Sequence, residues 1–438
     1  MRTRDSGLVW ATFVAGIGIC AIGCGADFSA DPDTTAADPN TVTTASALQA
    51  APSRMLDANT RFFVPAPNPG AVKQVVDLVK GKHLLDAARI TAMEATPKAV
   101  WFVGGTPAEV KKSVGKAVAA AKLQRAVPVL VAYNIPGRDC GGYSGGGAQT
   151  SADYAAWIDA FAAGIGCEKA VVILEPDGVA LSPDKCGNVA DADKPARQDE
   201  RNAELNAAID RLQLQPQTSV YLDAGHSHWL GVGEISGRLI SAGVQKAQGF
   251  FVDVSNYRSP ATEDKFGTWI SKCIAFGQDA EEGGWRLGHF DWCASQYYSP
   301  IPATGNLVNP DDITTWVYTD EWYDANMGTA TPTTHFVIDT SRSGQGPWHP
   351  TVAYPDAQDW CNPPGRGLGP RPTVATGNPL ANALLWVKIP GESDGSCNRG
   401  ISGASTDPEW GGIVDPAAGE WFPQQALELA RLATPPLF

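Results

Sequence analysis

Seven short runs of apolar residues recur along the chain and predict β-strands. They cover residues 99–105, 127–135, 170–178, 219–226, 249–257, 335–341 and 383–391. Most of these runs are continuous rather than alternating, which is typical of parallel strands buried on both faces. Helical patterns lie between several of them, at residues 107–124, 151–166, 197–214 and 263–276. Strands and helices in alternation predict an α/β fold with a parallel sheet and right-handed crossovers.

Polar and charged side chains collect where the predicted strands end. They are Tyr133, Asp139, Glu175, Asp177, Asp223, His226, Asn256, Asp339, Arg342, Glu392 and Asp394. In barrels built from strand–helix units, the C-terminal ends of the strands form one rim, and active sites form at that rim. We therefore expect one site shared by all the strands.

The N-terminal region lacks this alternation. Arg2 and Arg4 precede an apolar run at residues 8–22 that is too short for a comfortable membrane span, so residues 1–24 are interpreted as a signal peptide. Residues 21–24 are similar to a bacterial lipobox, and lipidation of Cys24 and ordinary cleavage nearby both stay open. Residues 25–58, rich in Thr, Ala, Asp and Pro, are expected to form a disordered tether. One folded domain is expected over residues 59–438.

Residues 258–334 contain few strand signals but many aromatic residues. A structureless stretch of that length is rare unless it is functional. We predict the helix at 263–276 followed by an elaborated loop, which a disulfide between Cys273 and Cys293 holds in place.

Charge narrows the class of ligand. Asp and Glu outnumber Lys and Arg by 47 to 33, for a formal net charge of -14, so no basic patch is available for a nucleic-acid backbone. Residues 104–107, Gly-Gly-Thr-Pro, match no phosphate-binding motif and are better explained as the start of a helix. No cofactor is therefore assigned. No metal is assigned either, and the chain is expected to act as a monomer.

Nine cysteines are present. An export signal makes disulfides plausible. With Cys20 and Cys24 set aside in or beside the signal segment, an odd number remains for the folded domain, so we expect three bridges and one unpaired thiol. Cys167, just ahead of the third predicted strand, is the candidate for that thiol.

Asp139 and Asp177 place two carboxyl groups after neighbouring strands. Hydrolysis of a glycosidic bond needs one carboxyl that stays protonated, and a nearby carboxylate raises the pKa of its neighbour by like-charge repulsion. Acids at strand ends also cap helices or pair with arginine, so these two residues alone leave the chemistry open. Asp339 and Arg342 are open in the same way, between a structural ion pair and a part in the site.

Several sequence blocks together resemble glycoside hydrolase family 6, in the family's order. They are Arg138-Asp139-Cys140, Glu175-Pro176-Asp177, residues 222–227, Ser255-Asn256-Tyr257, residues 338–344, Trp360-Cys361-Asn362, Trp386-Val387-Lys388 and residues 391–395. The resemblance runs from about Trp101 to Trp421. It implies an incomplete, seven-stranded parallel β/α barrel and an inverting hydrolysis of β-1,4-glucan.

The resemblance also implies roles for individual residues. Asp177 matches the proton donor, Asp139 the carboxylate that supports it, and Tyr133 the residue that helps to distort the sugar. Asp394 matches the candidate base, with a proton relay through water to Asp139 as the alternative. Ser144 matches a serine in a loop that positions water.

Substrate contacts follow from the same motif positions. Aromatic rings stack on the flat C–H faces of pyranose sugars. The expected binding residues are Trp101, Asp223, His226, Trp229, Asn256, Trp360, Lys388 and Glu392. For any single Trp, packing in the core is the alternative.

Two further bridges are expected, Cys140–Cys186 and Cys361–Cys397, because each would clamp a loop that bears one of the site's carboxylates. The second bridge would pin only the base of the loop at residues 398–419 and leave its distal part free. We therefore expect an open or loosely covered cleft and internal cleavage of cellulose or a related β-glucan. Chain-end cellobiohydrolase action is the alternative.

Two other classes stay open as remote alternatives. His226 and His228 beside Asp223 and Asp177 would suit a metal-dependent hydrolase. A non-catalytic carbohydrate-binding protein on the same fold is the other, although the presence of all three candidate catalytic aspartates argues against it. The protein is expected to be secreted, or tethered to the cell surface through Cys24.

Overall fold

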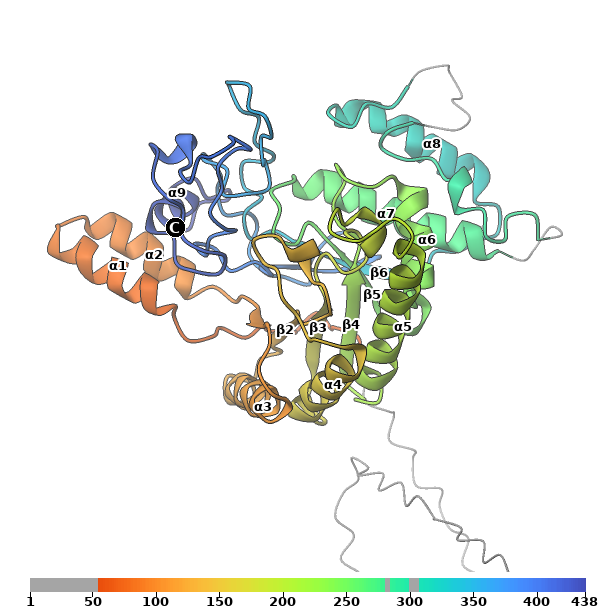
Figure 1. Cartoon of the computed structure of the whole chain (residues 1–438), viewed down its shortest axis with the longest axis horizontal. Helices are drawn as coiled ribbons and strands as arrows, with labels where there is room; N and C mark the ends of the chain where they lie inside the picture. The colour runs from red at the N-terminus through yellow and green to blue at the C-terminus, as the bar shows by residue number, and fades with distance from the viewer. Residues whose placement is uncertain (1–53, 280–283, 299–306) are drawn as a thin grey trace, which may run out of the picture. The chain divides into compact units, whose positions relative to one another are not determined.

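The computed structural model describes residues 54–279, 284–298 and 307–438 (Figure 1). The signal peptide and the lipobox predicted at residues 1–24 lie outside the described residues, as does most of the predicted tether. Within the described ranges, no helix combines the length and the apolar character that a membrane span requires.

The sheet contains seven parallel strands in the order of the sequence, as predicted. They are β1 Val100–Phe102, β2 Val129–Ala132, β3 Ala170–Leu174, β4 Thr218–Asp223, β5 Gly249–Val252, β6 His335–Asp339 and β7 Ala381–Leu385. Most predicted strands extend too far at their C-terminal ends. The reason is that apolar residues such as Ile135, Val254 and Val387 stay buried after the ladder has ended, so hydrophobicity does not mark the end of pairing.

The two faces of the sheet are both buried, which explains the continuous apolar runs. Val131 of β2 faces the inside of the curved sheet, where it packs with Ile173, Tyr221 and residues from the other strands. Leu130 beside it faces the opposite way and packs against the surrounding helices. Successive side chains point to opposite faces of a strand, so each short run supplies both cores at once.

The barrel is incomplete. The ladder runs from β1 to β7 without pairing β7 to β1. Single hydrogen bonds join the two edges instead: Ala99 N donates to Trp386 O at 2.9 Å, and Trp101 Nε1 donates to Val387 O at 2.7 Å.

Four helices match the predicted ones closely. They are α3 Pro107–Leu123, α4 Ser151–Ile165, α5 Lys194–Leu212 and α7 Pro260–Gln278. Thr106 begins α3 with a reciprocal capping interaction with Glu109, which confirms that residues 104–107 start a helix. Figure 1 shows α3, α4 and α5 on the outer side of strands β2 to β4.

Five helices were not predicted: α1 Pro69–Lys80, α2 Leu84–Glu94, α6 Val232–Ser241, α8 Val317–Asn326 and α9 Pro423–Arg431. Helices α1, α2 and α9 form a separate small core around Ala71, Ile90 and Leu429 and lie together beside the barrel (Figure 1). Helix α8 lies within the aromatic-rich stretch between β5 and β6, where Trp316 and Trp322 are buried.

The described chain begins within the segment predicted as a tether. The Arg54 guanidinium donates to Gln213 O, and Ser219 Oγ donates to Arg54 O. Phe62 forms a parallel bridge with Val127 and packs in the inner core of the sheet. Residues from 54 onward therefore contact the folded body.

The predicted disulfides Cys140–Cys186, Cys273–Cys293 and Cys361–Cys397 are confirmed. Cys167 is disulfide-bonded as well, so the prediction of an unpaired thiol is wrong. That prediction depended on the odd count left when Cys20 and Cys24 were set aside, and not on the surroundings of Cys167.

Candidate active site

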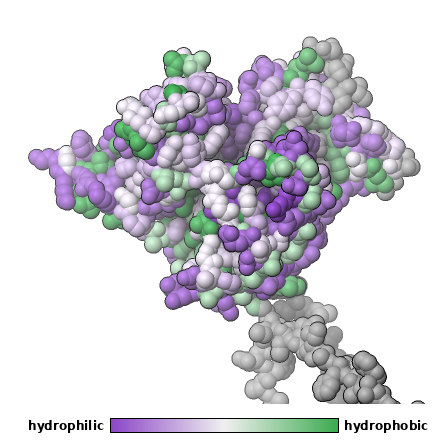
Figure 2. All heavy atoms as spheres, in the orientation of Figure 1, coloured by the Kyte–Doolittle hydropathy of each residue, from purple (hydrophilic) through white to green (hydrophobic). Residues whose placement is uncertain are grey.

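A cleft of about 500 Å³ lies at the C-terminal ends of the strands. Its lining residues are Trp101, Tyr133, Asp139, Tyr143, Ser144, Pro176, Asp177, Leu181, His226, His228, Trp229, Val254, Ser255, Asn256, Arg258, Asp359, Trp360, Lys388 and Asp394. All the residues predicted for the site are among them except Asp223 and Glu392. Figure 2 shows a hydrophilic hollow on the face that Figure 1 presents, between the region around α9 and the region around α6 and α7.

Asp177 follows β3 after a sharp turn in which Glu175 and Asp177 both have positive φ angles, 52° and 66°. The fully buried Glu175 carboxylate accepts hydrogen bonds from Asn134 N and Ile135 N at 2.9–3.0 Å. This joins the loop after β2 to the loop after β3, so Glu175 is a structural residue that aims Asp177 into the cleft.

The surroundings of the Asp177 carboxyl favour its protonated form. Burial raises its pKa, and the nearby carboxyl groups of Asp223 and Asp139 raise the pKa further. The only described hydrogen-bond donor to its oxygens is Tyr133 Oη, 3.4 Å from Oδ2. A buried carboxyl with so little compensation for a negative charge is suited to donate a proton.

Asp223 was expected to bind substrate, but the structure places it behind the cleft wall. Its carboxylate accepts from Ala180 N at 2.8 Å, Val179 N at 3.3 Å and Gly225 N at 3.0 Å. These bonds hold the turn that follows Asp177. Burial also raises the pKa of Asp223. Its part in the site is therefore to hold the turn and to repel charge on Asp177.

Asp139 lies in a loop that Arg138 organises. Ser144 N donates to Asp139 Oδ2 at 2.7 Å. The Arg138 guanidinium lies over the Tyr133 ring at 4.5 Å and donates to Ser144 O at 2.7 Å. Burial raises the pKa of Asp139, although the Ser144 amide and Arg138 act in the opposite direction. Arg138 belongs to one of the family-like sequence blocks, but no sequence pattern predicted that it organises this loop.

Tyr143, in the same loop as Asp139, also lines the cleft. Its ring lies against Gly395, where an added Cβ would come within 2.6 Å of the ring, and Gly395 has a φ of 145° that favours glycine. The ring also lies 6.0 Å from that of Trp360. Tyr143 was missed because the loop sequence around it, rich in Gly, carries no strand or helix pattern.

Asp394 is surrounded by donors. Its oxygens accept from Arg342 Nη1 at 2.8 and 2.9 Å, from Tyr257 Oη at 2.9 Å and from Asn362 N at 3.0 Å. Lys388 Nζ forms an ion pair with Oδ1 at 3.1 Å. Burial alone would raise its pKa, but Arg342 and Lys388 lower the pKa to about 2. Asp394 is thus permanently ionised at neutral pH. Arg342 pairs with Asp394, and not with Asp339.

His226, Trp229 and Arg258 line the wall opposite. The His226 and Trp229 rings lie 5.7 Å apart, and Arg258 forms an ion pair with Asp359 at 2.9 Å. Burial lowers the pKa of His226, and Arg258 and His228 lower it further, so His226 is neutral. Arg258 and Asp359 were missed, although Arg258 directly follows a predicted strand, and His228 was considered only as a metal ligand.

These histidines do not gather with the aspartates as metal ligands. In the described part of the chain, the only group of three or more such side chains within 4.8 Å is Cys397, Asp407 and Asp415. The sulfur of Cys397 belongs to a disulfide, and Asp407 is paired with Arg399.

Glu392 was expected to bond a sugar hydroxyl, but it contacts the start of α1 instead. Its Oε1 accepts from Asn68 Nδ2 at 2.9 Å, and Asn68 is the residue that caps α1. Trp360, by contrast, is 42% exposed at the cleft, so one of its faces is available for stacking.

The loop at residues 398–419 is not free at its distal end, contrary to expectation. Arg399 is 0% exposed and forms a buried ion pair with Asp407. Trp410 Nε1 donates to Asn362 O at 2.7 Å. These contacts fold the loop back on itself. The segment at 182–196, which follows Asp177, and the loop at 398–419 are the two that could roof the cleft. Among their described residues, none lines the cleft.

Residues 57–433 match the sequence profile of Glycosyl hydrolases family 6. Endoglucanase A of Cellulomonas fimi is 35% identical over 353 residues, which cover 80% of this chain and 57% of that protein. Endoglucanase 1 of Streptomyces halstedii is 34% identical over 405 residues, covering 92% and 93%. The solved endoglucanase Cel6 of Mycobacterium tuberculosis is 32% identical with a TM-score of 0.60, covering 86% of this chain and 98% of that one.

Replacing Arg342 should expose the cost of the buried charge on Asp394. In the folded chain the pKa of Asp394 lies below its ordinary value of 3.8. The ionised carboxylate therefore contributes stability that is fully present above pH 3.8 and is lost as the pH falls toward 2. Arg342→Met should lower the free energy of unfolding by about 3–5 kcal/mol at neutral pH, and this deficit should shrink as the pH falls.

Urea unfolding of both proteins from pH 7 to pH 3 measures this difference. Arg431→Met is the matched control, because Arg431 pairs with Asp86 at a half-exposed position and should cost about 1 kcal/mol or less. A deficit in Arg342→Met that does not change with pH would contradict the assignment.

Proposed function

The chain belongs to family 6 of the glycosyl hydrolases, and on that basis we propose that it is an inverting, endo-acting β-1,4-glucanase that hydrolyses cellulose or a related β-glucan. The observation that carries the proposal is the pair of oppositely tuned carboxyl groups in one cleft. Asp177 is held protonated and Asp394 is held ionised. An acid and an anion at one site suit a reaction that protonates a leaving oxygen while positive charge develops on the sugar.

Asp177 is the general acid in this mechanism. It donates its proton to the glycosidic oxygen as the bond to the anomeric carbon breaks. Tyr133, whose hydroxyl lies 3.4 Å from the Asp177 carboxyl, borders the sugar at the point of cleavage and favours its distorted form. A single weak hydrogen bond leaves the Asp177 proton available for transfer.

The proton of the attacking water passes to Asp139 through a second water held near Ser144. Asp394 is a poor base, since five hydrogen bonds and ion pairs occupy its oxygens and its pKa is lowered to about 2. Its fixed negative charge stabilises the positive charge of the transition state instead. The raised pKa of Asp139 suits it to accept a proton.

Trp101, Trp229 and Trp360 flank the cut and stack on glucose rings. Asn256, His226 and Lys388 line the cleft between them and bond hydroxyl groups. Related proteins support a glucan as the ligand: the Mycobacterium tuberculosis endoglucanase was solved with methyl-cellobiosyl-4-deoxy-4-thio-β-D-cellobioside.

Internal cleavage follows from the loops that could roof the cleft. Among the described residues, neither 182–196 nor 398–419 contributes to the lining, so a glucan chain can enter from the side. The two relatives from Cellulomonas fimi and Streptomyces halstedii are both named as endoglucanases, which agrees with this mode.

A polymeric substrate outside the cell requires export, and the predicted signal peptide at residues 1–24 would supply it. Disulfides at Cys140–Cys186, Cys273–Cys293 and Cys361–Cys397 suit an oxidising compartment. Anchoring through a lipid on Cys24 and a monomeric state stay predictions.

Loss of the acid should separate two kinds of substrate. Asp177→Ala should reduce cellulose hydrolysis by about 10²–10⁴-fold or more. Aryl cellobiosides with good leaving groups need little protonation, so they should keep measurable turnover. Initial rates on both substrates test this, and an equal collapse on both would contradict the role of Asp177 as the acid.

The two carboxyl groups that raise the pKa of Asp177 should do so to different extents. Asp223 contributes more than Asp139, so Asp223→Asn should shift the basic limb of the pH–rate profile further to lower pH than Asp139→Asn does. Asp139→Asn should also slow the reaction strongly, because it removes the proton acceptor. Profiles of kcat/KM against pH measure both effects. A basic limb that neither substitution moves would leave burial as the sole cause of the raised pKa.

The mode of attack can be measured with carboxymethylcellulose. An endo-acting enzyme lowers viscosity steeply for few new reducing ends, because one internal cut halves a chain and bulky substituents prevent threading through a tunnel. If viscosity barely moves while cellobiose accumulates from unmodified cellulose, the chain-end alternative holds.

A further inference from the structure

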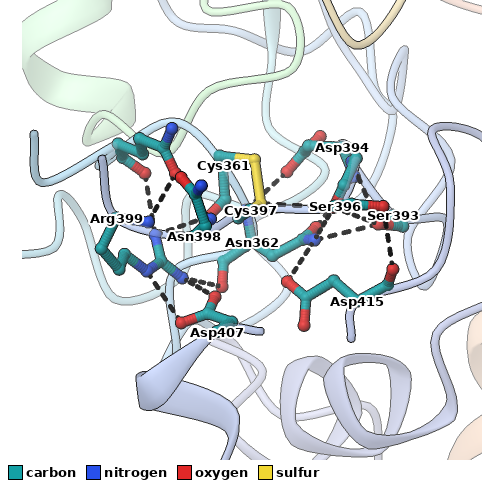
Figure 3. Close-up of a disulfide and its surroundings, with 12 residues drawn as sticks. Cys361, Asn362, Ser393, Asp394, Ser396, Cys397, Asn398, Arg399, Asp407 and Asp415 are labelled. Carbon is teal, nitrogen blue, oxygen red and sulfur yellow. Dashed lines mark hydrogen bonds and ion pairs between the residues drawn. A yellow bond between two sulfur atoms is a disulfide. The ribbon is translucent and has the colours of Figure 1, made fainter. Parts of the chain in front are cut away.

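Asn362 lies directly behind Asp394 and makes a reciprocal pair of hydrogen bonds with it (Figure 3). Asn362 N donates to Asp394 Oδ2 at 3.0 Å. In return, Asp394 N donates to Asn362 Oδ1 at 2.8 Å. A single residue therefore holds both the backbone and the carboxylate of Asp394.

The Asn362 side chain is 0% exposed and its amide is fully used. Nδ2 donates to Ser393 Oγ at 2.9 Å, Gly395 O at 3.0 Å and Asp415 Oδ2 at 2.9 Å. Oδ1 also accepts from Gln425 Nε2 at 3.1 Å. A carboxamide offers an acceptor toward Asp394 N and a donor toward Asp415 at every pH. The φ angle of Asn362 is 43°, which Asn tolerates better than most residues.

The backbone on the N-terminal side of Asp394 is held by other segments. Ser393 N donates to Glu420 O at 2.8 Å, and Ser393 O accepts from Gly419 N at 3.0 Å and from Lys388 Nζ at 3.1 Å. Arg342 and Lys388 fix the charge of the carboxylate, but neither bonds the Asp394 backbone. Among the described hydrogen bonds, the Asp394 N–H is held by Asn362 alone.

Asn362 is itself well anchored. Cys361 before it is bonded to Cys397. Its carbonyl oxygen accepts from Trp410 Nε1 at 2.7 Å and from Arg399 Nη2 at 3.2 Å. Given the proposed glucanase activity, on which this inference rests, we propose that Asn362 is the positioning residue that fixes Asp394 against its two cations and toward the cleft.

The charged groups around the pair are consistent with this role. Asp394 faces Arg342, Lys388 and the Tyr257 hydroxyl, and Asp415 lies behind it on the other side of Asn362. Burial raises the pKa of Asp415, and the nearby Asp407 raises it too. Asn362 donates to both carboxyl groups, through its backbone N to Asp394 and through Nδ2 to Asp415, and so limits their repulsion.

Asn362→Gly tests the proposal, because glycine keeps the left-handed backbone and removes only the amide. We expect kcat/KM on carboxymethylcellulose to fall about 100-fold, as a displaced group at a reacting centre does. The pKa of Asp394 should rise, because its carboxylate is held less closely to its cations. Asn398→Ala is the control: it removes bonds to Ile401 O and Ala404 O in the same region and should change neither kcat/KM nor the pKa of Asp394.

A kcat/KM of Asn362→Gly equal to that of the wild type would overturn the proposal. If this variant does not fold, Asn362→Asp keeps the acceptor for Asp394 N but turns the donor toward Asp415 into an acceptor. Its activity should recover as the pH falls, because a proton shared with Asp415 restores the donor. Activity equal to the wild type at every pH would overturn the positioning role.

Carboxyl-carbon NMR of aspartate-labelled protein gives a readout that needs no activity. Asp394 should titrate at higher pH in Asn362→Gly than in the wild type, and an unchanged titration overturns the proposal. A wild-type protein that hydrolyses no β-1,4-glucan would refute the proposed function instead, and the titration would still decide the role of Asn362.

Discussion

Buried carboxylates that accept backbone N–H groups from a neighbouring loop hold the rim of this barrel together. Glu175 after β3 accepts the amides that follow β2. Asp223 at the end of β4 accepts the amides that follow Asp177, and Asp339 at the end of β6 accepts Val387 N and Lys388 N after β7. A carboxylate is costly to bury, but charge-assisted bonds to backbone amides offset the cost and fix the two loops in one geometry. The positions of the reacting groups depend on these bonds, because the loops contain little regular secondary structure.

The chemistry of the cleft follows from how unequally its acids are compensated. Asp394 has two cations, a phenol and an amide around it, and it stays ionised. Asp177 has one long bond to Tyr133 and two like-charged neighbours, so it stays protonated. Both residues are aspartates, and only their surroundings differ. The two carboxyl groups would lose their opposite pKa shifts if either were given other neighbours. Residues behind the cleft, such as Asp223 and Asn362, therefore influence the chemistry as much as those that line it.

The disulfides and the C-terminal loop belong to the same arrangement. The Cys140–Cys186 bridge begins at the residue after Asp139, and the Cys361–Cys397 bridge joins the residue before Asn362 to the loop that follows Asp394. The loop at 398–419 is held back by the buried Arg399–Asp407 pair, so it supports the cleft from behind rather than covering it. Stability and open access are therefore products of the same contacts, and an open cleft is what internal cleavage of a long polymer requires.

The sheet and most of the cleft can be predicted from the sequence. Continuous apolar runs are forced by burial on both faces, and parallel strands bring their C-terminal ends to one rim, so residues as distant as Tyr133, His226 and Asp394 could be assigned to one site. The disulfides Cys140–Cys186 and Cys361–Cys397 were predicted from loops at the same rim, and Cys273–Cys293 from the long stretch after the fifth strand. Which acids face the substrate depends on tertiary contacts. Asp223 and Glu392 follow strands as the lining residues do, yet they turn toward Val179, Ala180 and Asn68, because a side chain at a strand end is directed by whichever donors the next loop presents. The pairing of Arg342 with Asp394 depends in the same way on contacts between segments far apart in the chain, and no local pattern predicts it.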